Sequence, residues 1–322
     1  MPIIDLHCDT IGCLYNKNDA GLSQNNLQID VDKLIKGKYM LQCFAMFVDS
    51  KKAEPFKTCI EMIDLFYEQI AKNKDLKICY TFNDIIKNAN DQKISALLTV
   101  EEGEVIEGNL SYLKTLHRLG VRMICLSWNY KNQLGYPNIN LNQENIDHFT
   151  PNVEDGLTKF GIEVVKMMND LNMIIDVSHL SDRGFWDVIN TSTKPIVASH
   201  SNCRSVCNHV RNLTDEMIIA LNKNGGIMGM NYCNEFLDND PQIGRRTIEC
   251  LIKHIKYIKK LVGVDVIALG SDFDGINNNI ELKDASLLTK LVDALYANGF
   301  TKEEIDKITY KNALRVFQEV LI

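Results

Sequence analysis

The feature that most constrains the fold is a repeated alternation of short apolar runs with longer amphipathic stretches. Eight runs rich in β-branched residues occupy residues 3–6, 40–48, 94–100, 121–127, 173–177, 195–199, 226–231 and 266–270. Runs of this length and composition predict buried strands. Two amphipathic stretches, around residues 160–171 and 248–261, carry apolar side chains at helical spacing, which places one face of each on the sheet. Strands that alternate with helices predict a parallel sheet covered by helices.

The number of these units favours one closed barrel. Eight β/α units match a (β/α)8 TIM-like barrel, whereas an open doubly wound sheet usually has about five to seven strands and often a glycine-rich phosphate loop after the first. No G-x-G-x-x-G or Walker sequence follows any of the runs. Thr301 and Glu304 form a capping box that predicts a closing C-terminal helix. No linker-like tract divides the chain, so we expect a single domain over residues 1–322.

Charge and cysteine content limit the partners. The formal net charge of −7 argues against nucleic acid or an anionic membrane surface, because both require concentrated positive charge. The ten cysteines are scattered, several of them in apolar runs, and no secretory signal or membrane-spanning stretch accompanies them. We therefore expect reduced cysteines, a cytoplasmic location and a small-molecule substrate. The oligomeric state stays open, with a homodimer as one candidate.

Metal-ligand and acid/base residues follow five of the predicted strands. In a parallel barrel the active site lies at the carboxyl ends of the strands. Three of the seven histidines lie there, and acidic residues accompany them. So many buried polar groups would be costly without cations, and imidazole with carboxylate suits zinc or a similar first-row ion. A carboxylate such as that of Glu101 can bridge two ions. The runs are His7-Cys8-Asp9, Glu101-Glu102, Ser178-His179, Ser199-His200 and Ser271-Asp272.

These runs also carry a family resemblance that spans nearly the whole chain. Their order and spacing resemble the membrane (renal) dipeptidase family of zinc hydrolases. The resemblance implies hydrolysis of dipeptides by metal-activated water, with tolerance for a D-residue at the C-terminal position. The matching runs are 5–9 (DLHCD), 100–103 (VEEG), 176–179 (DVSH), 199–201 (SHS) with 205–207 (SVC) and 211–212 (RN), and 270–275 (GSDFDG).

The resemblance also implies roles for single residues. His7 and Asp9 would bind one zinc ion, His179 and His200 the other, and Glu101 would bridge them. Arg211 would bind the C-terminal carboxylate of the dipeptide. Asp272 would handle protons near the nucleophilic water, with Asp274 as the alternative.

One position departs from the family pattern. Mammalian members carry a substrate-binding histidine in a T-H run after the fourth strand, where this chain has Ser127-Trp128-Asn129. Trp128 can donate one hydrogen bond but cannot hold a proton or a metal. The role in binding the carbonyl oxygen is thus the least transferable. His148, in the loop that follows, is a candidate replacement or a solvated loop residue.

The remaining histidines and the second glutamate suggest no further chemistry. His117 and His254 lie in helical patterns beside basic residues, so we expect both on the surface, whereas His209 is ambiguous. Glu102 is expected to lie outside the bridging position. Two rivals to a dipeptidase stay open: a metal-dependent amidohydrolase acting on N-acyl amino acids or lactones, and a barrel without catalysis. A carboxylate-binding Arg211 would favour the dipeptidase.

Overall fold

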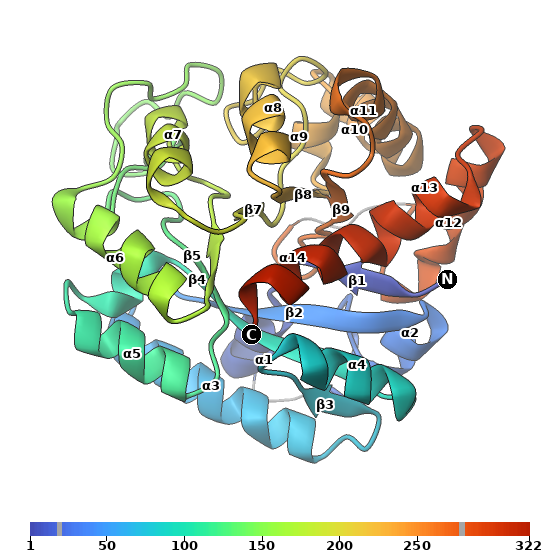
Figure 1. The fold of residues 1–322 in the computed structure, drawn as a ribbon, viewed down its shortest axis with the longest axis horizontal. Coiled ribbons are helices and arrows are strands. Elements are labelled where there is room, and N and C mark those ends of the chain that lie inside the picture. The colour runs from blue at the N-terminus through green and yellow to red at the C-terminus, as the bar shows by residue number, and fades with distance from the viewer. Residues whose placement is uncertain (18–20, 277–280) are drawn as a thin grey trace.

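Parallel strands form a closed barrel that helices surround (Figure 1). The computed structural model describes residues 1–17, 21–276 and 281–322. The strands in these residues are β1 (Ile3–Asp5), β2 (Tyr39–Phe47), β3 (Leu76–Ile78), β4 (Ile94–Glu101), β5 (Met123–Cys125), β6 (Ile174–Asp176), β7 (Val197–Ala198), β8 (Ile227–Met230) and β9 (Ile267–Leu269). All eight predicted runs are strands, and the predicted barrel is confirmed.

The barrel closes between strands that are neighbours in space but not in sequence number. The hydrogen-bonded order is β2-β1-β9-β8-β7-β6-β5-β4, and β4 pairs back with β2 along its whole length. Every pairing is parallel, as expected for strands connected through helices. The sequence did not predict β3, which pairs with the first half of β4 outside the closed ring. The strand has only three residues, and the central one is a lysine, so the sequence shows no apolar run there.

The helices form the outer layer of the molecule. Those in the described residues are α1 (Thr10–Lys17), α2 (Val31–Lys36), α3 (Pro55–Ala71), α4 (Phe82–Asn90), α5 (Leu110–Arg118), α6 (Lys159–Asp170), α7 (Asp182–Thr191), α8 (Asp215–Lys223), α9 (Asn234–Leu237), α10 (Pro241–Gly244), α11 (Thr247–Val262), α12 (Thr289–Ala297), α13 (Lys302–Asp306) and α14 (Asn312–Val320). Short 3₁₀ turns cover Gly103–Ile106 and Ala285–Leu287, and one π-helical turn covers Lys307–Lys311. The two predicted amphipathic stretches are α6 and α11, and each buries the expected face.

The C-terminal helices close the amino end of the barrel. Thr301 and Glu304 form the predicted capping box at the start of α13. After the π-helical turn, α14 lies across the strands, as Figure 1 shows in red. Its Val316 and Phe317 pack in one buried cluster with the inward-facing side chains of the strands, such as Ile4 and Leu97. Because these helices close the barrel at the amino ends of the strands, the barrel is open at the carboxyl ends of the strands.

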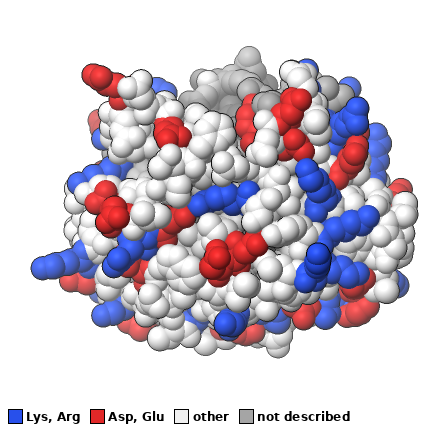
Figure 2. Space-filling view, turned by 90° about the horizontal axis from the view of Figure 1, so that it is seen from above, with Lys and Arg blue, Asp and Glu red and all other residues white. Residues whose placement is uncertain are grey.

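Neither a membrane-spanning helix nor a disulfide occurs in the described residues. In the described residues no helix is long and apolar enough to cross a membrane. On the face in Figure 2, acidic and basic side chains are interspersed, without a continuous basic tract. All ten cysteines lie in the described residues and none forms a disulfide; eight are buried and two are partly buried.

Candidate metal centre and substrate cavity

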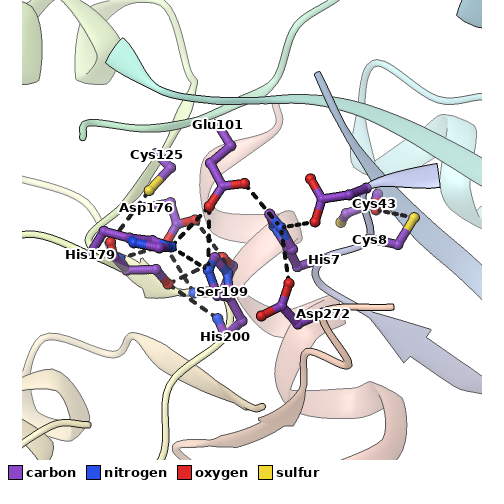
Figure 3. Close-up of polar contacts among 12 residues, drawn as sticks. His7, Cys8, Cys43, Glu101, Cys125, Asp176, His179, Ser199, His200 and Asp272 are labelled. Carbon is purple, nitrogen blue, oxygen red and sulfur yellow. Dashed lines mark hydrogen bonds and ion pairs between the residues drawn. The ribbon is translucent and has the colours of Figure 1, made fainter. Parts of the chain in front are cut away.

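Six polar side chains from five strand ends meet at the open end of the barrel (Figure 3). Residues that follow parallel strands share one rim, which is why distant parts of the sequence converge here. All six residues are at least nine-tenths buried. They are His7 and Asp9 after β1, Glu101 at the end of β4, His179 after β6, His200 after β7 and Asp272 after β9.

Glu101 lies between the histidines. Its Oε2 lies 3.5 Å from Nε2 of His7. Its Oε1 lies 3.0 Å from Nε2 of His179 and 3.5 Å from Nε2 of His200. The two oxygens of one carboxylate therefore face two different sets of imidazoles, which is the arrangement that a bridging ligand needs.

A second group surrounds His7. Its Nε2 lies 3.3 Å from Oδ2 of Asp9 and 3.9 Å from Oδ1 of Asp272. Gly275 makes this close approach sterically feasible. A Cβ at that position would lie 2.1 Å from Oδ2 of Asp9 and 2.6 Å from Oδ1 of Asp272. Any larger residue at the glycine of the D-F-D-G run would therefore collide with the two carboxylates.

The electrostatics of the cluster show how costly it is to bury these groups together. Burial raises the pKa of Asp9 to about 6 and that of Asp272 to about 7, although nearby His7 opposes both shifts. Burial also acts to raise the pKa of Glu101, but His7 and His179 outweigh it and hold that pKa well below its usual range. Burial and then the Arg211 charge lower the pKa of His179 to about 4. A bound cation would stabilise the carboxylates in their charged form.

The histidine rings are oriented as metal ligands. Nδ1 of His179 lies 2.9 Å from Oδ1 of Asn129, and Nδ1 of His200 lies 2.7 Å from Oγ of Ser199. With Nδ1–H donating in both rings, both Nε2 atoms carry a lone pair, and these atoms lie 3.0 Å apart. Two lone pairs and a carboxylate oxygen repel one another unless a cation lies among them. The residues therefore fit a metal ion.

The donor set also limits the kind of metal. Ligand atoms within 4.8 Å of one another form two groups in the described residues, His7 with Glu101 and His200, and His7 with Asp9 and Asp272. Oδ1 of Asp9 is buried and has no hydrogen-bond partner among the described residues, so it can coordinate a metal. Imidazole nitrogen mixed with carboxylate oxygen suits zinc and its first-row neighbours better than magnesium or calcium.

A cavity of about 350 Å³ opens onto this cluster. One part of its wall is apolar and includes Phe47 and Trp128, whose rings meet edge to face with centroids 4.8 Å apart. Trp128, which occupies the position of the substrate-binding histidine in the family pattern, thus lines the cavity. Asp9, Glu101, Asp272 and Arg211 supply polar groups to the lining. The volume suits a small molecule of a few residues.

Arg211 is a buried cation that interacts with the Asp272 and Glu101 carboxylates at a distance, without forming an ion pair with either. It is 3% exposed, and among the described residues it forms no ion pair. Its Nη2 donates a long, 3.4 Å hydrogen bond to the carbonyl oxygen of His200, while its Nε has no partner. Phe236 supports the guanidinium at 5.5 Å from the ring centroid. Such a group is costly unless an anion from outside pairs with it.

The two aspartates of the D-F-D-G run face different surroundings. Oδ2 of Asp272 accepts a 2.9 Å hydrogen bond from Asn231, which leaves Oδ1 facing His7. Asp274 instead accepts 2.6 Å hydrogen bonds from the Thr10 hydroxyl and the Gln28 backbone N–H. Its carboxylate therefore anchors the start of α1 and the loop before α2, although the residue also borders the cavity.

Unusual backbone conformations accompany these positions. His179, Asp272 and Asp274 have φ of 73°, 61° and 68°, and Glu102 has φ of 97°. Residues other than glycine rarely adopt this left-handed backbone conformation. Such strain is concentrated at functional sites, where the backbone must hold a side chain in a particular direction. The strained turns lie directly after the strands that supply the cluster.

Two expectations about single residues need correction or refinement. His254 was expected on the surface, but it is fully buried: its Nδ1 accepts from the Cys203 N–H at 3.1 Å, and its Nε2–H donates to the Leu237 carbonyl at 2.9 Å. His254 lies three residues after Leu251 and four before Ile258, on the buried face of α11, and the basic neighbours that suggested a surface position point elsewhere on the helix. His148 is exposed and stacks on His209, and it does not line the cavity.

Glu102 is buried next to the cluster but does not enter it. Its Oε1 accepts hydrogen bonds from Asn132 at 2.6 Å and from the Glu104 N–H at 2.9 Å. It therefore holds the loop after β5. Sequence reasoning assigned no role to Asn129, Asp176, Ser199 or Asn231, although Asp176 and Ser199 belong to the runs that carry the resemblance. Their partners are up to 50 positions away, so only the fold reveals them.

Comparison with known proteins gives one consistent result. The profile of the membrane dipeptidase family, peptidase family M19, matches residues 1–321. An uncharacterized protein of Klebsiella pneumoniae is 35% identical over 80% of this chain and 97% of its own length. A dipeptidase of Claviceps purpurea is 28% identical over 91% of this chain and 69% of its own. A Rhodobacter sphaeroides metallopeptidase, solved with a phosphinate mimic of the dipeptide L-Ala-D-Ala, has a TM-score of 0.89 at 25% identity and covers 99% of both chains.

Proposed function

Because the chain belongs to the membrane dipeptidase family, whose members are metallopeptidases, we propose that it hydrolyses dipeptides carrying a free C-terminal carboxylate in the cavity above Glu101. The observation that carries this proposal is the buried, unpaired guanidinium of Arg211 in the wall of a cavity that also contains the histidine and carboxylate cluster. Residues 1–322 would act as one hydrolase unit, since the family profile spans 1–321.

We propose two zinc ions as the cofactor. His7 and Asp9 would hold one, His179 and His200 the other, and Glu101 would bridge them. The two oxygens of Glu101 and the facing Nε2 lone pairs support this division. When bound, the ions would lower the pKa of a water to produce a nucleophile near neutral pH and polarise the scissile carbonyl.

The protein side chains would orient the substrate and move protons. Arg211 would bind the C-terminal carboxylate, because a guanidinium pairs with a carboxylate through two parallel hydrogen bonds. Asp272 would accept a proton from the attacking water at Oδ1 and deliver it to the leaving amine, while Asn231 holds its other oxygen. Trp128 and Phe47 would pack against a substrate side chain and keep bulk water away.

We further propose that a D-residue is accepted at the C-terminal position. The support is the Rhodobacter sphaeroides relative, whose ligand mimics L-Ala-D-Ala. The test uses the four stereoisomers of Ala-Ala with zinc-loaded protein, together with L-Ala-D-Ala amide. We expect cleavage of L-Ala-L-Ala and L-Ala-D-Ala and weak cleavage of the amide. Equal cleavage of the free and amidated dipeptides would instead favour an amidohydrolase that does not read the carboxylate.

A further inference from the structure

A closed hydrogen-bond network lies behind the ring of His200. Oδ1 of Asp176 accepts from the backbone N–H groups of Ser178 and Ser199, each at 2.9 Å. Oδ2 of Asp176 faces the hydroxyl of Ser199. The same hydroxyl oxygen lies 2.7 Å from Nδ1 of His200 and 3.2 Å from Oγ of Ser178. Figure 3 shows Asp176, Ser199 and His200 in this order, and all are at least 99% buried.

Proton counting fixes the direction of these bonds. Oδ1 of Asp176 already accepts two backbone N–H groups, and Oδ2 accepts the single hydroxyl proton of Ser199. The oxygen of Ser199 can then only accept from His200 Nδ1. Ser178 accepts from the His200 backbone N–H at 3.1 Å, and its own proton can reach the second lone pair of Ser199. Every donor and acceptor is satisfied only when His200 carries its proton on Nδ1.

We propose that Asp176, acting through Ser199, is a positioning residue that fixes the proton of His200 on Nδ1 and aims the Nε2 lone pair at Glu101. A serine hydroxyl alone could reverse its bond and donate to Nδ1, which would move the ring proton to Nε2. The buried carboxylate prevents this reversal. The inference depends on the proposed metal centre for its purpose, but the ring proton can be measured without any metal.

The ends of β1 and β9 provide a matched comparison. Oδ1 of Asp5 accepts from the Ser271 N–H at 2.9 Å and from the His7 N–H at 3.3 Å, as Asp176 does for its own strand pair. Ser271 is fully buried like Ser199 and also directly precedes a residue of the cluster, Asp272. Its hydroxyl, however, contacts the Asp5 carboxylate and two backbone groups, the carbonyl of His7 and the N–H of Phe273, the last two at 3.2 Å. Both serines thus help to connect strand ends, but only Ser199 contacts an imidazole.

The first experiment is ¹H–¹⁵N NMR of the histidine rings in metal-free wild-type protein at neutral pH. The His200 signals are assigned by their loss in His200→Asn. We expect the proton on Nδ1. A His200 ring with unprotonated Nδ1 and a proton only on Nε2 would overturn the proposal, and this result requires no stable variant of Asp176 or Ser199.

The second experiment compares zinc affinity in Ser199→Ala and Ser271→Ala by competition with a chelator of known affinity. We expect Ser199→Ala to weaken binding of one zinc ion by about 10- to 100-fold, the range for the loss of such a supporting contact, and Ser271→Ala to stay close to wild type. The side-chain amide in Asp176→Asn can donate to Ser199, which would reverse the direction of the hydrogen bonds from residue 176 to His200. This variant should weaken zinc binding and place the His200 proton on Nε2.

Thermal unfolding of the metal-free variants measures the structural cost separately. Equal zinc affinities in Ser199→Ala and Ser271→Ala would reduce Ser199 to a packing residue and refute the inference. A wild-type protein that binds no zinc would refute the proposed function instead, while the proton position on His200 would still be decided by NMR.

Discussion

Replacing Arg211 by lysine tests whether the buried guanidinium reads the substrate carboxylate. Lysine keeps the positive charge but cannot form two parallel hydrogen bonds to one carboxylate. In the structure the guanidinium has an unpartnered Nε and only a 3.4 Å hydrogen bond from Nη2, so most of its donors are free for a ligand. The loss therefore falls on substrate binding rather than on an existing contact in the protein.

The size of the effect follows from one lost charge-assisted hydrogen bond. Such a bond contributes roughly 1.5–3 kcal/mol. We expect kcat/KM for free L-Ala-D-Ala to fall by about 10- to 150-fold. L-Ala-D-Ala amide has no carboxylate to lose, so its already low kcat/KM should change far less. The assay measures kcat/KM for both substrates in both proteins, with zinc content determined in parallel.

Arg204 offers a matched control in the same loop. Its guanidinium already pairs with Asp182 at 2.6 and 2.8 Å, and it does not line the cavity. Arg204→Lys should therefore lower stability without changing the preference for the free over the amidated dipeptide. If Arg211→Lys lowers kcat/KM equally for both substrates, with zinc content unchanged, the carboxylate-binding role is refuted.

Three further predictions follow from the cluster and from His254. Glu101→Gln should reduce bound zinc and turnover far more than Glu102→Gln, measured by elemental analysis and kcat; a larger loss at Glu102 would place the bridge one residue away. Purified protein should hold close to two divalent ions per chain, lose activity to a chelator and regain it with zinc; activity indifferent to chelation would contradict the metal centre. Burial lowers the pKa of His254 to about 4, below its unfolded value near 6.5, so its stabilising contribution is present above pH 6.5 and lost as the pH falls toward 4. The stability advantage of wild type over His254→Gln in urea unfolding should therefore shrink by about 2 kcal/mol between pH 7 and pH 5, and an unchanged difference would refute the assignment.

The barrel was predictable because its strands are local patterns. Each strand is buried on both faces, so it appears in the sequence as a continuous apolar run, and eight such runs limited the architecture to few alternatives. β3 was missed because it lacks such a run: Leu76–Ile78 is a three-residue segment with a lysine at its centre. His254 was misplaced because its basic neighbours were given more weight than its position, which follows Leu251 by three residues and precedes Ile258 by four on the buried face of α11.

The convergence of the candidate ligands was also predictable, but their orientation was not. His7, Glu101, His179, His200 and Asp272 follow parallel strands, and the carboxyl ends of such strands lie on one rim whatever the loops do. By itself, the sequence thus determined which side chains meet. Only the tertiary structure decided which ring nitrogen faces inward, that Arg211 forms no ion pair among the described residues, and that Asp176 and Asn129 support the histidines. The supporting contacts join Asn129 to His179 and Asp176 to Ser199, which are 50 and 23 positions apart, so packing of the whole barrel rather than any local pattern sets their distances and directions.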